Sequence, residues 1–151
     1  MDNEKKFIPI EILLVEDNLA DIRLTEKALE ESKIAINLNI VNDGVEAINF
    51  LKRKDKYKGA IKPDLILLDL NLPKKSGLEV LEEIKNEPDL KQIPVVILTI
   101  SENRQDLMNA YSLYANCYIN KPLDLQEFYK VVKSIENFWF TIVKLPIKEE
   151  N

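Results

Sequence analysis

Acidic residues follow two apolar segments of this sequence in a pattern that could support chemistry. Glu16 and Asp17 come directly after residues 10–15, which are apolar apart from Glu11, and Asp69 ends the apolar run within residues 63–73. Apolar runs of this length are typical of strands that are buried on both faces, as in a parallel sheet covered by helices. Ligands bind beyond the carboxyl ends of such strands, so we expect these three carboxylates at a functional edge of the sheet.

Two further polar residues fall at the ends of predicted strands. Thr99 ends the apolar residues 94–99, and Lys121 closely follows the short strand predicted for residues 116–119. If all strands run parallel, their carboxyl ends bring Thr99 and Lys121 to the same edge as Asp69. Either residue alone would more often be an ordinary surface residue, but their coincidence with the acidic residues favours a site.

Three clustered carboxylates repel one another, so one of them would hold a proton unless a cation intervened. Mg²⁺ is the cation that we expect, because it prefers oxygen ligands and binds through one or two carboxylates, waters and phosphate. Phosphoryl transfer requires an in-line nucleophile and neutralisation of the phosphoryl oxygens. Asp69 can be the nucleophile and form an acyl phosphate, while the Lys121 ammonium and the Thr99 hydroxyl can stabilise the oxygens.

The rest of the chain predicts the elements that position these residues. Five strand-like segments alternate with five helical segments, which indicates a doubly wound α/β domain with right-handed crossovers. Strands are predicted for residues 10–15, 36–41, the run that ends at Asp69, 94–99 and 116–119, and helices for a segment capped by Asn18, 45–52, 77–86, 103–114 and 124–137. We expect a lead at residues 1–9, one domain at 10–137 and a C-terminal extension at 138–151.

Composition narrows the class of protein. A chain of 151 residues suits one domain, and its single cysteine, Cys117, excludes an internal disulfide and suits a reducing compartment. The formal net charge of -5 argues against general binding to nucleic acid. Neither a signal peptide nor a membrane-spanning run is visible, so a cytoplasmic protein is expected. Basic residues crowd residues 52–62, which we interpret as a solvated loop in preference to a site for an acidic partner.

Taken together, these motifs resemble the receiver domain of two-component response regulators over about residues 10–135. The resemblance is carried by Leu14-Val15-Glu16-Asp17, Leu68-Asp69 with Pro73 and Gly77, Leu98-Thr99, and Tyr118-Ile119-Asn120-Lys121-Pro122. It implies a flavodoxin-like fold with a five-stranded parallel sheet in the order 2-1-3-4-5. It also implies that Asp69 accepts a phosphoryl group from a histidine kinase.

The resemblance further implies how the metal is bound. Asp17, Asp69 and the main-chain carbonyl of Asn71 would bind Mg²⁺ directly, and Glu16 would act mainly through metal-bound water. Glu16 stands where aspartate is common in the family, a difference that keeps the charge.

A switch is implied as well, in which Thr99 moves toward the phosphoryl group and Tyr118 rotates into the vacated space. The family also has a cis peptide bond at the position of Lys121-Pro122. Ile100 departs from the family, because the residue after the threonine is usually small. We expect that Ile100 shields the phosphoryl group and slows its transfer or hydrolysis.

The C-terminal extension begins with three consecutive aromatic residues, Phe138, Trp139 and Phe140. Exposed, they would form an apolar patch for self-association, whereas the alternative is that the extension folds back onto its own domain. This extension, the basic residues 52–62 and the run 64–75 also resemble single-domain regulators of bacterial phytochrome-type kinases. That narrower resemblance implies a light-sensing histidine kinase as partner and a homodimer interface at the extension.

The sequence therefore predicts a stand-alone response regulator, a phosphoacceptor switch and not an enzyme, that signals through protein contacts because no output domain fits after the receiver. One alternative is a Mg²⁺-dependent phosphatase with an aspartyl-phosphate intermediate. Such enzymes generally carry an acidic residue where this chain has Asn71. Another is a flavin-binding module, in which Glu16 and Asp17 would repel the flavin phosphate.

Overall fold

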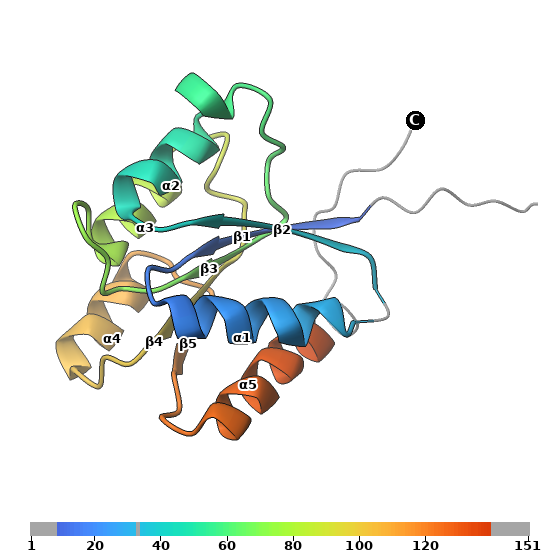
Figure 1. Cartoon of the computed structure of the whole chain (residues 1–151). Helices are drawn as coiled ribbons and strands as arrows, with labels where there is room; N and C mark the ends of the chain where they lie inside the picture. The colour runs from blue at the N-terminus through green and yellow to red at the C-terminus, as the bar shows by residue number, and fades with distance from the viewer. Residues whose placement is uncertain (1–8, 33, 140–151) are drawn as a thin grey trace, which may run out of the picture.

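A computed structural model of the chain describes residues 9–32 and 34–139, and its described part forms one five-stranded parallel sheet with helices on both faces (Figure 1). The strands are β1 (Ile10–Val15), β2 (Ile36–Val41), β3 (Leu65–Leu68), β4 (Val95–Thr99) and β5 (Cys117–Asn120). The helices are α1 (Leu19–Glu30), α2 (Gly44–Leu51), α3 (Gly77–Asn86), α4 (Arg104–Ser112) and α5 (Leu125–Asn137), with a short 3-10 helix η1 (Asp55–Tyr57). The strand order β2-β1-β3-β4-β5 confirms the predicted flavodoxin-like receiver fold.

The strand register aligns the carboxyl ends of the strands. Val15 pairs with Val41 on one side and with Leu68 on the other, and Thr99 pairs with Asn120. The strand-end loops consequently gather at one edge of the sheet, on the left of Figure 1, where α1 also begins.

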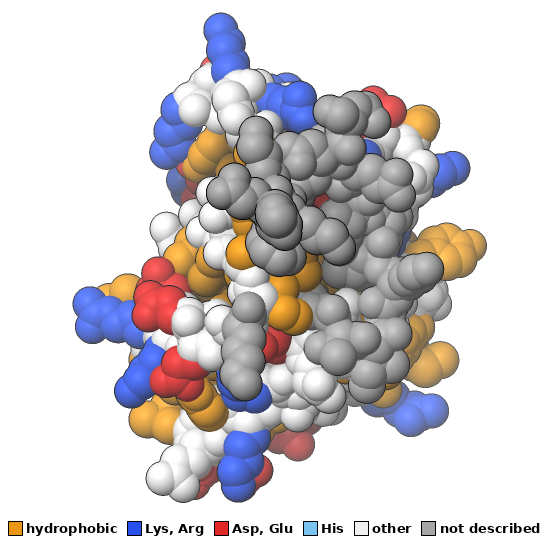
Figure 2. Space-filling view, turned by 90° about the vertical axis from the view of Figure 1, so that its right-hand side faces the viewer, with side chains coloured by type: hydrophobic (Ala, Val, Ile, Leu, Met, Phe, Trp, Pro, Cys, Tyr) orange, Lys and Arg blue, Asp and Glu red, His pale blue; other side chains and the backbone are white. Residues whose placement is uncertain are grey.

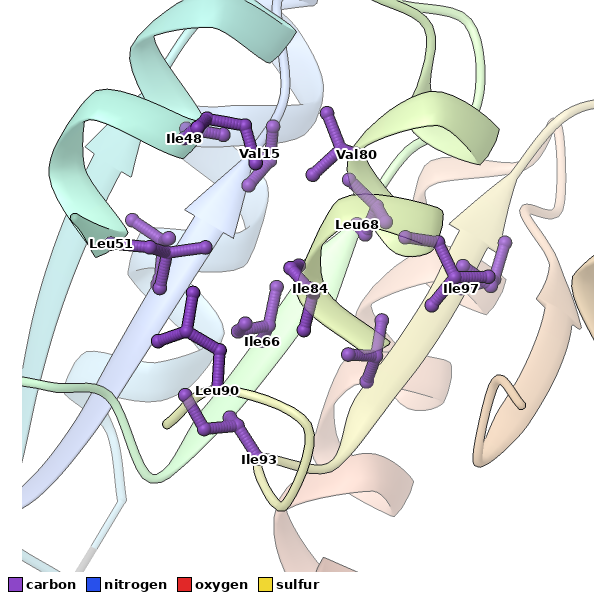
Figure 3. Packing of buried hydrophobic residues seen from close by; sticks show 14 of the residues in the cluster. Val15, Ile48, Leu51, Ile66, Leu68, Val80, Ile84, Leu90, Ile93 and Ile97 are labelled. Atoms are coloured by element: carbon purple, nitrogen blue, oxygen red, sulfur yellow. The ribbon is translucent and has the colours of Figure 1, made fainter. Parts of the chain in front are cut away.

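Alternate residues of each buried strand pack against different helices. Leu13 and Val15 belong to the cluster that α2, α3 and α4 cover, where Figure 3 shows Val15 near Ile48 and Val80. Ile12 and Leu14 belong to the cluster beneath α1 and α5. Burial on both faces explains why β1 and β3 are apolar almost throughout.

Side-chain caps begin the helices where the strand-end loops return. Asn18 accepts a hydrogen bond from the Asp21 amide at the start of α1, and Asp43 accepts one from the Glu46 amide at the start of α2. Ser76 forms a capping box with Glu79 at the start of α3. Such caps satisfy amides that have no partner inside the helix. They therefore fix where each loop of the functional edge ends.

Gly77 permits α3 to begin directly against the strand that leads to Asp69. A Cβ atom at this position would lie 2.3 Å from the main-chain oxygen of Asp69 and 2.5 Å from the Cα of Leu70. The Gly77 amide also donates to the Leu70 carbonyl at 3.0 Å. The close approach of the two backbones explains why glycine is required here.

The structure differs from the prediction in several local details. Helix α4 is shorter than the predicted 103–114, and the basic connection before β3 contains η1, which was not predicted from the sequence.

Cys117 is half-buried, and burial raises the pKa of its thiol. Within the described residues, no helix combines the length and apolar character that crossing a bilayer requires.

The basic residues 52–62 lie in the connection between α2 and β3, at the top of Figure 1 and among the Lys and Arg side chains at the top of Figure 2. Lys52 forms ion pairs with Glu83 and Glu87, and Lys56 forms one with Glu46. The pairs of Lys52 connect the start of this segment to α3 and its carboxyl end, whereas Lys56, which is 72% exposed, pairs with α2.

Candidate functional site

Three carboxylates meet at the carboxyl edge of the sheet. Glu16 and Asp17 follow β1, Asp69 follows β3, and one oxygen from each lies within 4.8 Å of the others. Glu16 and Asp69 are buried, with 3% and 5% of their surface exposed, whereas Asp17 is exposed. The acidic cluster can therefore be reached from solvent on the side of Asp17.

Lys121 places its ammonium group inside this cluster. Its Nζ atom lies 2.5 Å from Glu16 Oε1 and 2.9 Å from Asp69 Oδ2. A third carboxylate, Asp21 in the first turn of α1, accepts a hydrogen bond from the same atom at 2.9 Å. Burial by itself would lower the pKa of Lys121, but the contacts with Asp21, Glu16 and Asp69 outweigh it and raise this pKa. The ammonium group thus stays charged at every physiological pH.

One ammonium group does not balance the acidic residues around it, since Asp17 also belongs to the cluster. Burial raises the pKa of Glu16 to about 7, with a contribution from the charge of Asp69, although the hydrogen bond from Lys121 opposes the change. A cation bound beside Glu16 would favour its charged form and so oppose this increase in pKa. The donor set of carboxylate oxygens fits a hard divalent cation, which Glu16, Asp17 and Asp69 could hold.

Asn71 and Thr99 complete the surroundings of Asp69. The Asn71 amide donates to Asp69 Oδ1 at 3.1 Å, so each carboxylate oxygen of Asp69 has a partner, Lys121 being the other. The Asn71 side-chain amide lies 3.4 Å from the hydroxyl oxygen of Thr99, which is fully buried. Asn71 therefore connects the Asp69 carboxylate, which its main-chain amide contacts, to the Thr99 hydroxyl group, which its side-chain amide contacts.

Ser101 connects this site to β5 and α4. Its main-chain amide donates to Thr99 Oγ1 at 3.3 Å, and its carbonyl accepts hydrogen bonds from the Tyr118 hydroxyl at 3.3 Å and the Asn120 side-chain amide at 2.6 Å. The Ser101 hydroxyl donates to Asp106 of α4 at 2.6 Å. Sequence reasoning missed this residue because nothing in a lone serine marks it as a junction.

Two features near the site are the peptide bond between Lys121 and Pro122, where the expected cis form is wrong, and the side chain of Ile100. The bond between Lys121 and Pro122 is not cis in the structure, which has no cis peptide bond among the described residues. The trans form is the one that X-Pro bonds generally favour, by about 0.5–1 kcal/mol. Ile100 is 57% exposed next to the buried Thr99, so its side chain faces solvent at the rim of the site.

The structure thus brings Glu16, Asp17, Asp69, Thr99 and Lys121 together, with Asn71 in contact and Tyr118 one step removed. Asp21 was missed as a site residue, because an acidic residue in the first turn of a helix is sufficiently explained by its favourable interaction with the helix dipole. Its only sequence signal is that it lies four residues after Asp17, one helical turn into α1.

Phe138 and Trp139 directly follow the carboxyl end of α5, at Asn137. Phe138 is 50% exposed, whereas Trp139 is partly buried and packs against the cluster beneath α1 and α5. Phe140 lies outside the described residues. At the start of the extension, Trp139 therefore contacts its own domain, whereas the neighbouring Phe138 is half exposed to solvent.

Comparison with known proteins relates this geometry to a family. The model of the response regulator receiver domain matches residues 12–133. The chain is 51% identical to the response regulator Rcp1 of Synechocystis sp. over 138 residues, which cover 91% of this chain and 94% of Rcp1.

Solved structures agree with this match. The crystal structure of the Mn²⁺-bound form of Rcp1 superposes with a TM-score of 0.90 at 50% identity and covers 92% of this chain and 100% of that one. That of the phosphorylated cyanobacterial phytochrome response regulator RcpA gives a TM-score of 0.91 at 49% identity and covers 93% and 100%.

We expect a divalent cation to stabilise the folded chain through Asp17. Mg²⁺ at about 100 times its dissociation constant should stabilise the fold by about 2.7 kcal/mol, which raises the melting temperature by about 5–10 °C in a domain of this size. Asp17→Asn should lose most of this increase, since Asp17 is the exposed member of the cluster. Thermal unfolding followed by circular dichroism measures the effect. The exposed Asp89 provides the control, and an equal increase in Asp17→Asn and Asp89→Asn would contradict the assignment.

Proposed function

The chain belongs to the response regulator receiver domain family, and on that premise we propose that it is a phosphorylation-controlled switch whose phosphoacceptor is Asp69. The observation that carries this proposal is the buried Asp69 carboxylate, held by Lys121 at 2.9 Å inside a cluster of acidic residues. Phosphorylated RcpA, a relative at 49% identity, supports it. The phosphatase alternative is not supported, since Asn71 stands where such enzymes generally have an acidic residue.

Asp69 is the nucleophile of the proposed transfer. An oxygen of Asp69 forms a bond to phosphorus while the bond from phosphorus to the donor nitrogen of a kinase histidine breaks, so the electron pair of that bond leaves with the imidazole. Lys121 holds Asp69 before transfer and is placed to hold a phosphoryl oxygen afterwards. Thr99 can donate its hydroxyl proton to another oxygen.

Mg²⁺ is the ion that we propose for the site, and a divalent cation there would neutralise charge on the phosphoryl oxygens. Asp17, Asp69 and the main-chain carbonyl of Asn71 would hold it directly, and Glu16 would act through water. The proximity of the three carboxylates supports this set, and so does the Mn²⁺-bound form of Rcp1.

We propose that Thr99 and Tyr118 transmit the phosphorylated state. If the Thr99 hydroxyl turns toward a phosphoryl group, its bond from the Ser101 amide is lost, and the Ser101 carbonyl is the acceptor of the Tyr118 hydroxyl. A local change of charge would then bias the packing of α4 and β5. Signalling through protein contacts follows from a change at this surface.

The proposed phosphodonor is a histidine kinase of the phytochrome type. RcpA, a cyanobacterial phytochrome response regulator, supports this class of kinase, and three exposed aliphatic residues in or next to the strand-end loops support docking of a protein at the site. Leu19, Ile100 and Leu123 are 59%, 57% and 93% exposed. We place the protein in the cytoplasm, because a lone cysteine suits a reducing compartment.

Incubation with acetyl phosphate and Mg²⁺ should add one phosphoryl group to the wild type, and Asp69→Asn should abolish this labelling because the amide is no longer a nucleophile. Intact-protein mass spectrometry measures the added group, and hydroxylamine should remove it, as expected for an acyl phosphate. Asp89→Asn is the control and should be labelled like the wild type. Equal labelling of Asp69→Asn would refute the assignment of the phosphoacceptor.

Phosphotransfer from a kinase should depend on the exposed Leu123, whereas labelling by acetyl phosphate, a small donor, should not. Leu123→Ser should reduce the rate of transfer from an autophosphorylated cyanobacterial phytochrome kinase by about tenfold, equivalent to about 1.4 kcal/mol of lost contact. Labelling by acetyl phosphate should be unchanged. Ile61→Ser, at an exposed position near the amino end of β3, serves as the matched control. If Leu123→Ser slows both donors equally, the residue does not dock the kinase.

We also propose that the chain forms a homodimer through the start of its extension. Phe138 lines an apolar groove of about 460 Å³ with Cys117, Ile119 and Trp139, and half of its own surface is exposed. An exposed aromatic ring beside an apolar groove is a surface that a second copy could cover. The competing surface is formed by α4, β5 and α5, where Met108 is 50% exposed.

Light scattering after size exclusion should give the mass of a dimer for the wild type. Phe138→Ala should shift the mass toward that of a monomer, while Trp139 remains to pack against the domain. Met108→Ala should remain dimeric. A monomeric wild type would refute the homodimer, and a monomer produced only by Met108→Ala would assign it to the competing surface.

A further inference from the structure

The β2–α2 turn, defined as Asn42, Asp43 and the first residue of α2, Gly44, contributes no carboxylate to the acidic cluster but contacts both loops that do. On one side, the Asn42 side-chain amide donates to the main-chain carbonyl of Glu16 at 3.1 Å. The Glu16 amide donates to the Val41 carbonyl at 3.0 Å, immediately before the turn. The backbone at Glu16 is therefore held from two directions by the end of β2.

On its other side, the turn supports the loop between β3 and α3. A Cβ atom at Gly44 would lie 2.0 Å from the Lys75 carbonyl oxygen and 2.7 Å from the Lys75 carbonyl carbon. The Gly44 amide points to the Pro73 carbonyl at 3.5 Å. Because backbone atoms fill the space, a side chain at Gly44 could be accommodated only if the β3–α3 loop moved.

Asp43 adds a charge contact to the same support. One of its oxygens caps α2 through the Glu46 amide at 2.8 Å, and the other lies 3.5 Å from Lys74 Nζ. Lys74 has a φ angle of 67°, a left-handed conformation that is unfavourable for a residue with a side chain. Lys74 has this conformation in the loop that contacts Asp43 and Gly44.

A displacement at Lys75 would reach the metal site through a short, tightly bonded loop. The Lys75 amide donates to the Pro73 carbonyl at 2.8 Å, and the Leu72 amide donates to the Leu70 carbonyl at 3.1 Å. The Asn71 amide holds Asp69 Oδ1 at 3.1 Å. The orientation of the Asp69 carboxylate and the position of Asn71 thus depend on where this loop rests.

We propose that the β2–α2 turn sets the spacing between the two loops that provide the metal ligands, so that Asn42 and Gly44 are positioning residues for divalent cation binding. Asn42 holds the loop of Glu16 and Asp17, and Gly44 holds the loop of Asp69 and Asn71. Partners of metal ligands outside the coordination shell commonly change metal affinity by about 10–100-fold when they are replaced. The inference rests on the metal site proposed above.

Isothermal titration calorimetry with Mn²⁺ and with Mg²⁺, well below the melting temperature of each variant, tests this inference. Gly44→Ala should weaken binding by about 10–100-fold. Asn42→Ala, which truncates an exposed side chain, should weaken it in the same direction. Gly59→Ala is the matched control, because a Cβ atom there would meet nothing within 4 Å, and it should bind like the wild type. Unfolding of each metal-free variant is measured separately.

The possible outcomes separate the inference from the proposed function. Loss of stability in Gly44→Ala or Asn42→Ala with unchanged metal affinity would mean that the turn only packs, which overturns the inference and leaves the metal site intact. If Gly44→Ala does not fold, Asn42→Ala decides alone, and unchanged affinity in that variant overturns the inference. A wild type that binds neither cation would overturn the metal site and the inference together.

Discussion

The contact of a single buried ammonium group with several carboxylates governs the functional edge of this protein. Lys121 contacts Glu16, Asp21 and Asp69 with nitrogen to oxygen distances between 2.5 and 2.9 Å. Buried charges are stable only when they are paired and hydrogen-bonded, so the acidic residues and the lysine require one another. The pairing is incomplete because one ammonium group contacts three carboxylates and Asp17 adds a fourth to the cluster, and this excess of negative charge favours a cation at the edge.

Sheet topology makes the contact possible. Asp69 follows the central strand β3, Glu16 follows its neighbour β1, and Lys121 follows the edge strand β5 on the other side of β4. Two strand spacings separate β5 from β3, a distance of about 10 Å. A long, flexible lysine side chain can cover much of that distance, whereas a short polar side chain could not. Thr99, from the intervening strand β4, needs only its short hydroxyl side chain.

Close backbone contacts and hydrogen bonds also position the strand-end loops around Asp69. Gly77 lets α3 approach the main chain of Asp69, and Gly44 lets the β3–α3 loop rest on the first turn of α2. Ser101 holds Thr99 on one side and accepts hydrogen bonds from Tyr118 and Asn120 on the other. Asp69, the proposed phosphoacceptor, thus lies among close backbone contacts, which suits a protein whose proposed task is to change shape after a change of charge.

The sequence by itself determined the fold class and the identity of the central residues, because both are encoded in local patterns. Apolar runs that end in Asp17, Asp69 and Thr99, alternating with capped helices, specify parallel strands, and parallel strands share a carboxyl edge. Tertiary structure alone decided the contacts between residues that no local pattern connects. Asp21 reaches Lys121 across 100 positions of the chain, and Asn42 reaches the carbonyl of Glu16 across 26. Likewise, only packing separated Trp139, which contacts its own domain, from the exposed Phe138. Local sequence fixes where strands and helices begin, whereas these contacts depend on how the elements pack, and packing is a property of the whole chain.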